Sequence, residues 1–449
     1  VEPASGKRDQ GYLRTRNVAF FASAELGWKN MLYLSATGRC DWASQLVSNG
    51  DTPCIFYPSI GLSGIISEMV KLPEFISYLK LRTSYTEVGS PITQTGITPG
   101  TVTDPMSGGV INPISTYPYP DFKPERTKSY EVGINARFLN GRISFDGTFY
   151  QSNTYNQTFL SVMSPATGYS GFYVQAGNVR NRGVEMTLGY NDTFGKVNYS
   201  THLTYTANQN KIVEMVHDYR NPIDNSLVNI TELTLKEVGD VYLREGYSMS
   251  DVFTTGILQR GRDGKLVEEG NGYQVDRSQR IRLGSADPDF TMGWRHDINY
   301  KNISLGLMIT GRFGGIVTSQ TQAFMDAFGV SKVSAEARDN GGVMLDGHRY
   351  DAERYYNTVG GQGLMSYYTY DATNVRLQEL SLTYSLPKKW LGDVFNNATI
   401  SFVGRNLFMF YRKAPFDPDM NGSTGTYNRS DFFMAPSLRN LGFSIKFSL

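Results

Sequence analysis

The sequence predicts an all-β protein whose antiparallel strands cross a membrane as part of a β-barrel. Three observations favour this fold class. Apolar and polar residues alternate in a series of hairpins, in runs of about 9–11 residues, the length that a tilted membrane-crossing strand needs. Connections within hairpins are short and those between hairpins are long, which is typical of outer-membrane barrels. No apolar run approaches the roughly 18 residues of a transmembrane helix.

The composition is that of a protein rich in strands and turns. Its 449 residues include 29 Tyr, 25 Phe and 46 Gly, a mix that favours β-structure over helix. The 43 basic and 42 acidic residues nearly balance, so no nucleic-acid partner is predicted. The GxSxG, P-loop and HExxH signatures are absent, and the four histidines are widely separated. We therefore predict no enzymatic activity, no cofactor and no metal site.

The stretch YEVGINARFLNGRISFDGTFY, residues 130–150, shows the hairpin pattern. Asn140-Gly141 predicts a type I′ turn, because both central residues of that turn need a positive φ. Pairing across this turn produces a face without charge, formed by Val132, Ile134, Ala136, Phe138, Ile143, Phe145, Gly147 and Phe149. The opposite face pairs Arg137 with Ser144, Asn135 with Asp146, and Glu131 with Tyr150. Such a sheet has one wet face and one dry face, and the dry face meets either a protein core or lipid.

The same alternation recurs along the chain. Further short turns are predicted at Lys29-Asn30, at 192–195 and at Lys301-Asn302. The runs form six hairpin pairs that start near residues 18, 55, 127, 181, 289 and 372, followed by one strand at 436–449. Thirteen strands are an odd number, whereas bacterial single-chain barrels have an even number and leave no open edge. We therefore predict that residues 18–449 are the C-terminal part of a larger barrel, entered through a surface loop at 1–17.

The long connections are predicted to be extracellular loops. They fall at about 89–126, 154–180, 210–288, 314–371 and 412–435. Loops of this length are usually functional. The segment YSMSDVFTTGIL at 247–258 also has a strand pattern, and we place it inside a loop because another spanning strand would break the alternation of sides. The alternative is a soluble β-protein that binds or hydrolyses carbohydrate, in which loop lengths would be more even.

Two cysteines, Cys40 and Cys54, lie 14 positions apart on either side of the polar segment DWASQLVSNGDTP. If this segment is an exposed loop in an oxidising compartment, a disulfide across it is feasible. Two free thiols are the alternative, and the sequence does not decide between them. Their spacing matches no zinc or redox motif.

Several segments together resemble one known family. They are MLYLSATGRCDWAS, FYPSIGLSGIISEMVKLPEFISYLKLRTSYTEVGSPI, FKPERTKSYEVGINARFLNGRISFDGTFYQSNTYNQTF, GNVRNRGVEMTLGYN and GRNLFMFYRKAPFDPDMNGSTG. The order and separation of KLRTSYTEVG, KPERTKSYEVG, GVEMTLGY and GRNLF make the similarity specific, and it runs from about residue 12 to the end of the sequence. These segments resemble the barrel of SusC/RagA-type TonB-dependent outer-membrane transporters.

The resemblance implies a 22-stranded barrel with a plugged lumen in the outer membrane of a Gram-negative bacterium. Thirteen strands would come from this chain. The family's plug and TonB box have no counterpart in the sequence, so the remainder of the transporter is an expected partner. The resemblance further implies a SusD-like surface lipoprotein as a lid, contact with TonB through the missing N-terminal part, and contact with outer-membrane lipid. The implied function is import of oligosaccharides. Import of peptides is the alternative within the family, and a passive porin or a surface adhesin is the alternative outside it.

Aromatic residues gather in the predicted loops and are candidates for ligand binding. Their rings can cover the apolar face of a sugar while hydroxyl groups bond to its rim. The candidates are Tyr117, Tyr119, Tyr169, Phe172, Tyr173, Tyr355, Tyr356, Tyr367 and Tyr368. The alternative is that these rings pack the loops together or contact the lid protein, where Tyr is also enriched.

The stretch DPDMNG at 417–422 resembles the start of a calcium-binding loop. Asp417, Asp419, Asn421 and Gly422 have the spacing with which an EF-hand begins, but position twelve is Asn428 rather than Glu. We interpret the stretch as an ordinary Asp/Asn/Gly turn.

Overall fold

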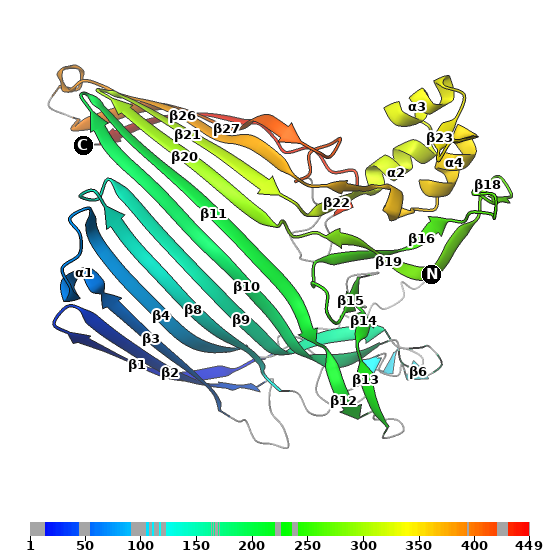
Figure 1. Cartoon of the computed structure of the whole chain (residues 1–449), viewed down its shortest axis with the longest axis horizontal. Coiled ribbons are helices and arrows are strands. Elements are labelled where there is room, and N and C mark those ends of the chain that lie inside the picture. The colour runs from blue at the N-terminus through cyan, green and yellow to red at the C-terminus, as the bar shows by residue number, and fades with distance from the viewer. Residues whose placement is uncertain are drawn as a thin grey trace, which may run out of the picture.

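The computed structural model describes most of the chain and consists largely of β-strands (Figure 1). The described residues are 14–44, 54–90, 105–106, 110–111, 116–117, 123–162, 164, 166, 169, 171–220, 226–235, 241–392, 395–419 and 430–448. Of the predicted surface loop at 1–17, residues 1–13 lie outside this set, and the first strand begins at Asn17.

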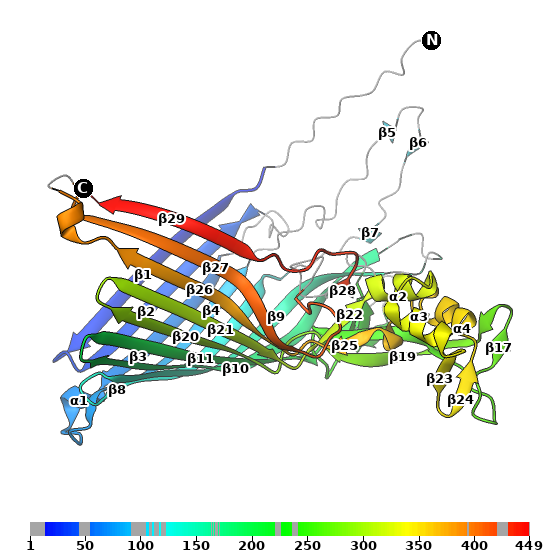
Figure 2. The ribbon, with the colours of Figure 1, turned by 90° about the horizontal axis from the view of Figure 1, so that it is seen from above.

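Thirteen strands pair in chain order to form one curved antiparallel wall, with β1 and β29 at its two edges (Figure 2). The wall strands are β1 (Asn17–Trp28), β2 (Leu32–Ala43), β3 (Ile55–Ile65), β4 (Ile76–Ser90), β8 (Glu125–Phe138), β9 (Ile143–Val162), β10 (Gly171–Phe194), β11 (Val197–Glu214), β20 (Phe290–Tyr300), β21 (Ile303–Phe313), β26 (Asn374–Ser385), β27 (Asn397–Arg412) and β29 (Asn440–Ser448). The predicted number and order of spanning strands are confirmed.

The hairpin of β8 and β9 has the predicted register. Phe138 pairs with Ile143, Val132 with Phe149, and the polar pairs match as well. The turn contains three residues with positive φ, Leu139 (52°), Asn140 (56°) and Gly141 (84°). Asn and Gly tolerate this conformation well, which explains why the chain reverses here.

One face of the wall is predominantly apolar across the thirteen strands, with His296 of β20, bonded to Tyr199, as a polar exception. The pairings put the alternating residues of each strand on the same side as Val132 and Phe149 of the central hairpin. Large side chains on this face are exposed, for example Val132 at 59% and Phe443 at 67%. An apolar surface of this extent is unfavourable in water. Within the described residues no second layer covers it, so lipid rather than a protein core is its natural contact.

The opposite face carries charge. Arg82 of β4 makes two hydrogen bonds to the carboxylate of Asp146 in β9, at 2.9 and 3.0 Å. Asn135 of the intervening strand β8 donates to the same carboxylate at 2.8 Å. This face therefore lines the lumen of the barrel.

Several wall strands are longer than predicted. β9 has 20 residues, β10 has 24 and β11 has 18, against the predicted 9–11. Much of the range 154–180, predicted as a loop, is therefore strand. About ten residues suffice to cross the hydrocarbon. The strands continue beyond it because their backbones remain paired and polar side chains bond across them, as Asn153 does with Asn178 at 2.7 Å.

The long connections contain short strands and helices. The loop strands are β5 (Pro105–Met106), β6 (Val110–Ile111), β7 (Thr116–Tyr117), β12 (Val216–Arg220), β13 (Leu227–Ile230), β14 (Glu232–Thr234), β15 (Tyr242–Arg244), β16 (Asp251–Leu258), β17 (Glu268–Glu269), β18 (Gly272–Tyr273), β19 (Val275–Ser285), β22 (Ile316–Ser319), β23 (Val343–Leu345), β24 (His348–Tyr350), β25 (Thr369–Asp371) and β28 (Ser430–Asp431). The loop helices are α2 (Gln320–Ala327), α3 (Lys332–Asp339), α4 (Ala352–Val359) and the 3₁₀ turn η3 (Met365–Tyr367). Two further turns, α1 (Ile66–Met69) and η4 (Lys388–Trp390), lie at the short-connection end.

The prediction that 247–258 belongs to a loop is confirmed, because β16 pairs with β19 and not with the wall. The helices and the β16–β19 sheet lie together at the end opposite the short turns (Figure 1). In the part of the chain that the structure describes, no helix is both long and apolar enough to cross a membrane.

We predict that Phe443→Lys in the full-length protein impairs assembly in the outer membrane. Phe443 pairs with Phe402 in the middle of β29, and a lysine near the bilayer midplane destabilises a barrel by ~2–4 kcal/mol. Heat-modifiable electrophoretic mobility of the folded barrel measures the effect. Ser444→Lys, on the opposite face, is the matched control; Asp146 is unsuitable because it bonds to Arg82. Equal assembly of both variants would contradict the assignment of faces.

Candidate ligand-binding site

A cavity of about 700 Å³ lies within the long connections, and we call it the loop cavity. Strands β16 and β19 contribute to its lining together with helix α2 and the glycine-rich turn after α4. Its lining includes Tyr242, Phe253, Arg277, Arg280, Phe324 and Gln362. Most of its exposed lining is polar, and a concave site of this kind with a few aromatic rings suits a polar ligand.

Aromatic rings form a rigid platform in the loop cavity. The ring of Phe253 in β16 meets Tyr242 and Tyr247 edge to face, with centroids 5.1 and 5.6 Å apart. Tyr242 also donates a hydrogen bond to the carboxylate of Glu232. Burial, followed by this bond, raises the pKa of Tyr242 above its ordinary value. The edge-to-face contacts and this hydrogen bond therefore hold the Tyr242 ring in place.

Three arginines of β19 lie beside this platform. The guanidinium of Arg280 stacks over the ring of Tyr242, 4.1 Å from its centroid. Arg277 donates weakly to the carbonyl oxygens of Thr255 and Gln362, at 3.4 and 3.3 Å. Arg282 forms an ion pair with Asp251 at 2.7 Å, and that hydrogen bond raises the pKa of Arg282.

The N-terminus of helix α2, which contributes to the cavity lining, is held by hydrogen bonds of Ser319. Ser319 accepts a hydrogen bond from the backbone N–H of Gln322, which caps the helix. The Ser319 hydroxyl donates in turn to the buried carboxylate of Asp431, at 2.8 Å. Strand β28, which carries Asp431, pairs in parallel with β22 immediately before the helix.

The structure places four of the predicted tyrosines in the hydrophobic core of the loops. Tyr355, Tyr356 and Tyr368 are buried among residues of α4, β18 and β24, and Tyr367 packs against them. Burial raises the pKa of the Tyr355 hydroxyl. None of the four lies in the lining of the loop cavity. This placement favours loop packing over direct ligand contact for these residues.

The other predicted aromatic residues belong to different clusters. Tyr173 is buried with Ala43, Ile55 and Tyr57, whereas Phe172 packs against a separate core around Val174. Tyr169 is partly buried. Tyr117 forms part of β7, whose backbone pairs with Phe172, and Tyr119 lies outside the described residues. The predicted candidates that the structure describes are therefore divided among separate clusters.

The cavity residues Tyr242, Phe253, Arg277 and Arg280 were not predicted from the sequence. The sequence holds one signal for them. The segment 247–258 has a strand pattern within a loop, and the segment VDRSQRIR at 275–282, which pairs with it in the structure, holds three arginines. The two segments are separated in the sequence by residues 259–274, so no local sequence pattern predicts that they pair.

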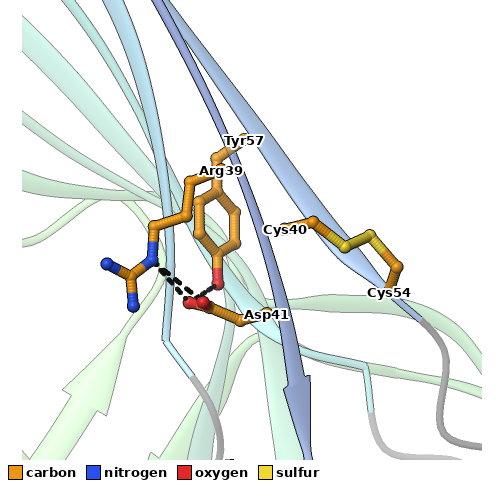
Figure 3. The surroundings of a disulfide bond; sticks show 5 residues. All are labelled: Arg39, Cys40, Asp41, Cys54 and Tyr57. Atoms are coloured by element: carbon orange, nitrogen blue, oxygen red, sulfur yellow. Dashed lines mark hydrogen bonds and ion pairs between the residues drawn. A yellow bond between two sulfur atoms is a disulfide. The ribbon is translucent and has the colours of Figure 1, made fainter. Parts of the chain in front are cut away.

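Cys40 and Cys54 form a disulfide in the structure, with their Cα atoms 5.7 Å apart (Figure 3). Cys40 lies near the end of β2, and the bond closes the segment between β2 and β3. On the opposite face of β2, Asp41 accepts hydrogen bonds from Arg39 at 2.9 Å and from Tyr57. The alternation along the strand separates the sulfur atoms from this charged pair.

The carboxylates of the calcium-like stretch bind an arginine. Asp417 and Asp419 lie 3.0 and 2.7 Å from Nη2 of Arg376, whose side chain is buried. Asn421, Gly422 and Asn428 lie outside the described residues. Among the described residues no cluster of His, Cys, Asp and Glu could hold a metal ion.

The wall, its lipid-facing side, its charged lumen and its folded loops define a membrane-spanning β-barrel protein. Residues 2–310 match the family described as TonB dependent receptor-like, beta-barrel, and the chain belongs to this family. The family resides in the outer membrane of Gram-negative bacteria. The recognition made from the sequence motifs is confirmed.

The chain is similar to several known proteins. It is 24% identical to TonB-dependent receptor P3 of Formosa agariphila, over 96% of this chain and 46% of that protein. It is 23% identical to TonB-dependent receptor SusC of Bacteroides thetaiotaomicron, over 99% of this chain and 45% of that protein. The structure of the RagAB peptide transporter has a similar fold, with a TM-score of 0.73 at 16% identity. The match covers 96% of this chain and 47% of the chain in that structure. The chain spans about half the length of the curated relatives it matches.

We predict that Tyr355→Ala loosens the loop core without changing the wall. Removing a buried aromatic side chain costs ~3–5 kcal/mol, and Tyr355 is 8% exposed. Limited proteolysis of the purified full-length protein should show faster cleavage between residues 314 and 371. Phe328→Ala, at a position that is 77% exposed, is the control. If the variant resists proteolysis as well as the wild type but binds ligand more weakly, Tyr355 contacts the ligand instead.

We predict that the segment after β27 loses its anchorage in acid. Burial alone would raise the pKa of Asp417, but hydrogen bonds from Ser437 and Asp419 and the charge of Arg376 together lower it. A lowered pKa stabilises the folded state above the ordinary aspartate value of about 4, and the contribution disappears as the pH falls further. Hydrogen exchange of residues 413–419, corrected for intrinsic rates, should accelerate below about pH 4. Asp417→Asn should remove this dependence, and a dependence that survives would refute the assignment.

Proposed function

We propose that this chain is the C-terminal barrel portion of a TonB-dependent importer that carries oligosaccharides across the outer membrane. The loop cavity is the observation that carries the proposal. It combines the ring of Phe253, which Tyr242 contacts edge to face, with polar side chains such as Thr255 and Gln362. Aromatic faces suit the C–H side of sugar rings, and amides and hydroxyls suit their rims.

The proposed transporter needs components beyond this chain. A SusD-like surface lipoprotein would close over the loops as a lid. A plug and the remaining strands would fill and complete the barrel, and TonB would act through that part. Closure over a ligand is a hinge motion that separates it from external water before transport. The folded loops, with their own hydrophobic cores, offer the lid a surface of defined shape.

Peptide import is the second candidate. The fold similarity to the RagAB peptide transporter is the observation that favours it. An aromatic cavity with arginines also suits peptide side chains and carboxylates. A passive porin and a surface adhesin remain the contrasting classes, because neither requires energy from TonB.

We predict that uptake of a labelled oligosaccharide by cells with the full-length protein stops when TonB is deleted. Energised transport depends on TonB, whereas diffusion through a porin does not. Uptake should be measured beside that of a labelled oligopeptide of similar size. Equal sugar uptake without TonB would support a porin, and TonB-dependent uptake of the peptide alone would support the RagA-like alternative.

A further inference from the structure

We propose that the loop cavity recognises an acidic group, a carboxylate or a sulfate, on the imported oligosaccharide through Arg277 and Arg280. The inference rests on the proposed import of oligosaccharides and narrows its substrate class. It comes from two positive charges in the cavity lining that form no ion pair with any described residue. Both arginines lie in the cavity lining, on the same strand β19, three residues apart.

Arg277 and Arg280 contact only uncharged groups among the described residues. Arg277 reaches Thr255 and Gln362, and Arg280 reaches the hydroxyl of Thr234 at 3.4 Å and the ring of Tyr242. Neither forms an ion pair in the described part of the chain, whereas the neighbouring Arg282 does. Two guanidinium groups therefore give the cavity a positive charge that a ligand can neutralise.

Two acidic residues near the cavity, within the described part of the chain, already have hydrogen-bond partners. Asp251, the carboxylate in the lining, is held by Arg282 at 2.7 Å and by the backbone N–H of Ser248 at 3.0 Å. Glu232 accepts a hydrogen bond from the hydroxyl of Tyr242. The charge of Asp251 is thus balanced by Arg282, so Asp251 opposes an anionic ligand less than a free carboxylate would.

The position of Arg280 over the Tyr242 ring, 4.1 Å from its centroid, favours binding of an anion. A guanidinium carries five N–H donors, and beyond the 3.4 Å bond to Thr234 they can reach two oxygens of a carboxylate or sulfate. Tyr242 itself is fixed by Glu232 and Phe253, so little side-chain entropy remains to be lost when a ligand binds. The adjacent ring of Phe253 offers the apolar surface that the body of a sugar needs.

A structural role is the competing explanation, since Arg277 bridges β16 and the turn after α4 through Thr255 and Gln362. The two roles differ in what they predict. A structural arginine affects every ligand alike, whereas a recognition arginine affects acidic ligands selectively. The contribution of a recognition arginine to binding also weakens with added salt, because exposed charges are screened.

The test uses the purified full-length transporter, with binding measured by calorimetry. The probes are a uronic-acid oligosaccharide, a sulfated oligosaccharide, a neutral oligosaccharide of equal length and an acidic peptide. Hydrogen bonds to a charged group contribute about 1.5–3 kcal/mol, so Arg280→Gln and Arg277→Gln should each weaken binding of the acidic sugar by roughly 10- to 150-fold. Neutral-sugar binding should stay within about twofold. Arg262→Gln, an exposed loop arginine outside the cavity lining, is the matched control.

Additional variants keep the outcome interpretable. Arg280→Lys retains the charge but loses the planar fork, so it should recover part of the affinity for the acidic sugar. Phe253→Ala should weaken acidic and neutral sugars together. Carboxylate-selective or sulfate-selective binding would each support the inference and identify the anionic group.

Three results would overturn the inference. The first is equal affinity of the wild-type protein for acidic and neutral sugars, and the second is an equal loss for both in the arginine variants. The third is binding of the acidic peptide alone, which would also overturn oligosaccharide import. Tight binding and TonB-dependent uptake of the neutral sugar alone would refute the acidic preference and leave the proposed function standing.

Discussion

The alternation of side chains, kept in register from one edge of the wall to the other, is the constraint on which the structure depends. In hydrocarbon every backbone N–H and C=O group must be paired, so the strands cannot separate. A slip of one residue in the pairing would move the lipid-facing side chains of a strand to the lumen and its polar side chains to the lipid. The Arg82–Asp146 pair opposes such a slip, because it joins β4 to β9 across β8, whose Asn135 bonds to the same carboxylate.

Beyond the membrane the same strands operate under different rules. The long strands β9, β10 and β11 continue into water, where their polar side chains bond across strands. The connections that follow cannot use lipid to cover apolar surface, so they fold around small cores of their own. The protein therefore consists of a wall that lipid stabilises on the outside and folded loops that are stabilised from within.

Sequence patterns predict the wall well because its rules are local. Alternation, turn residues such as Asn140-Gly141 and strand length act over neighbouring positions, and the register of β8 and β9 follows from them. The loops are harder to predict. A tyrosine such as Tyr355 can cover a ligand or fill a core, and the residue type is the same in both cases. The cavity also depends on the distant pairing of β16 with β19 and on the position of α2, which no local pattern specifies.

Strand β28 is joined to the start of helix α2 by its pairing with β22 and by the Ser319–Asp431 hydrogen bond. Asp431 and Ser430 belong to the last long connection, yet they pair with β22 and bond to Ser319, so two long connections share one small sheet. Helix α2 carries Phe324 into the cavity lining, and Ser430 is part of that lining as well. The segment around β28 and helix α2 therefore form one connected side of the loop cavity, so the two long connections cannot move apart unless this pairing breaks.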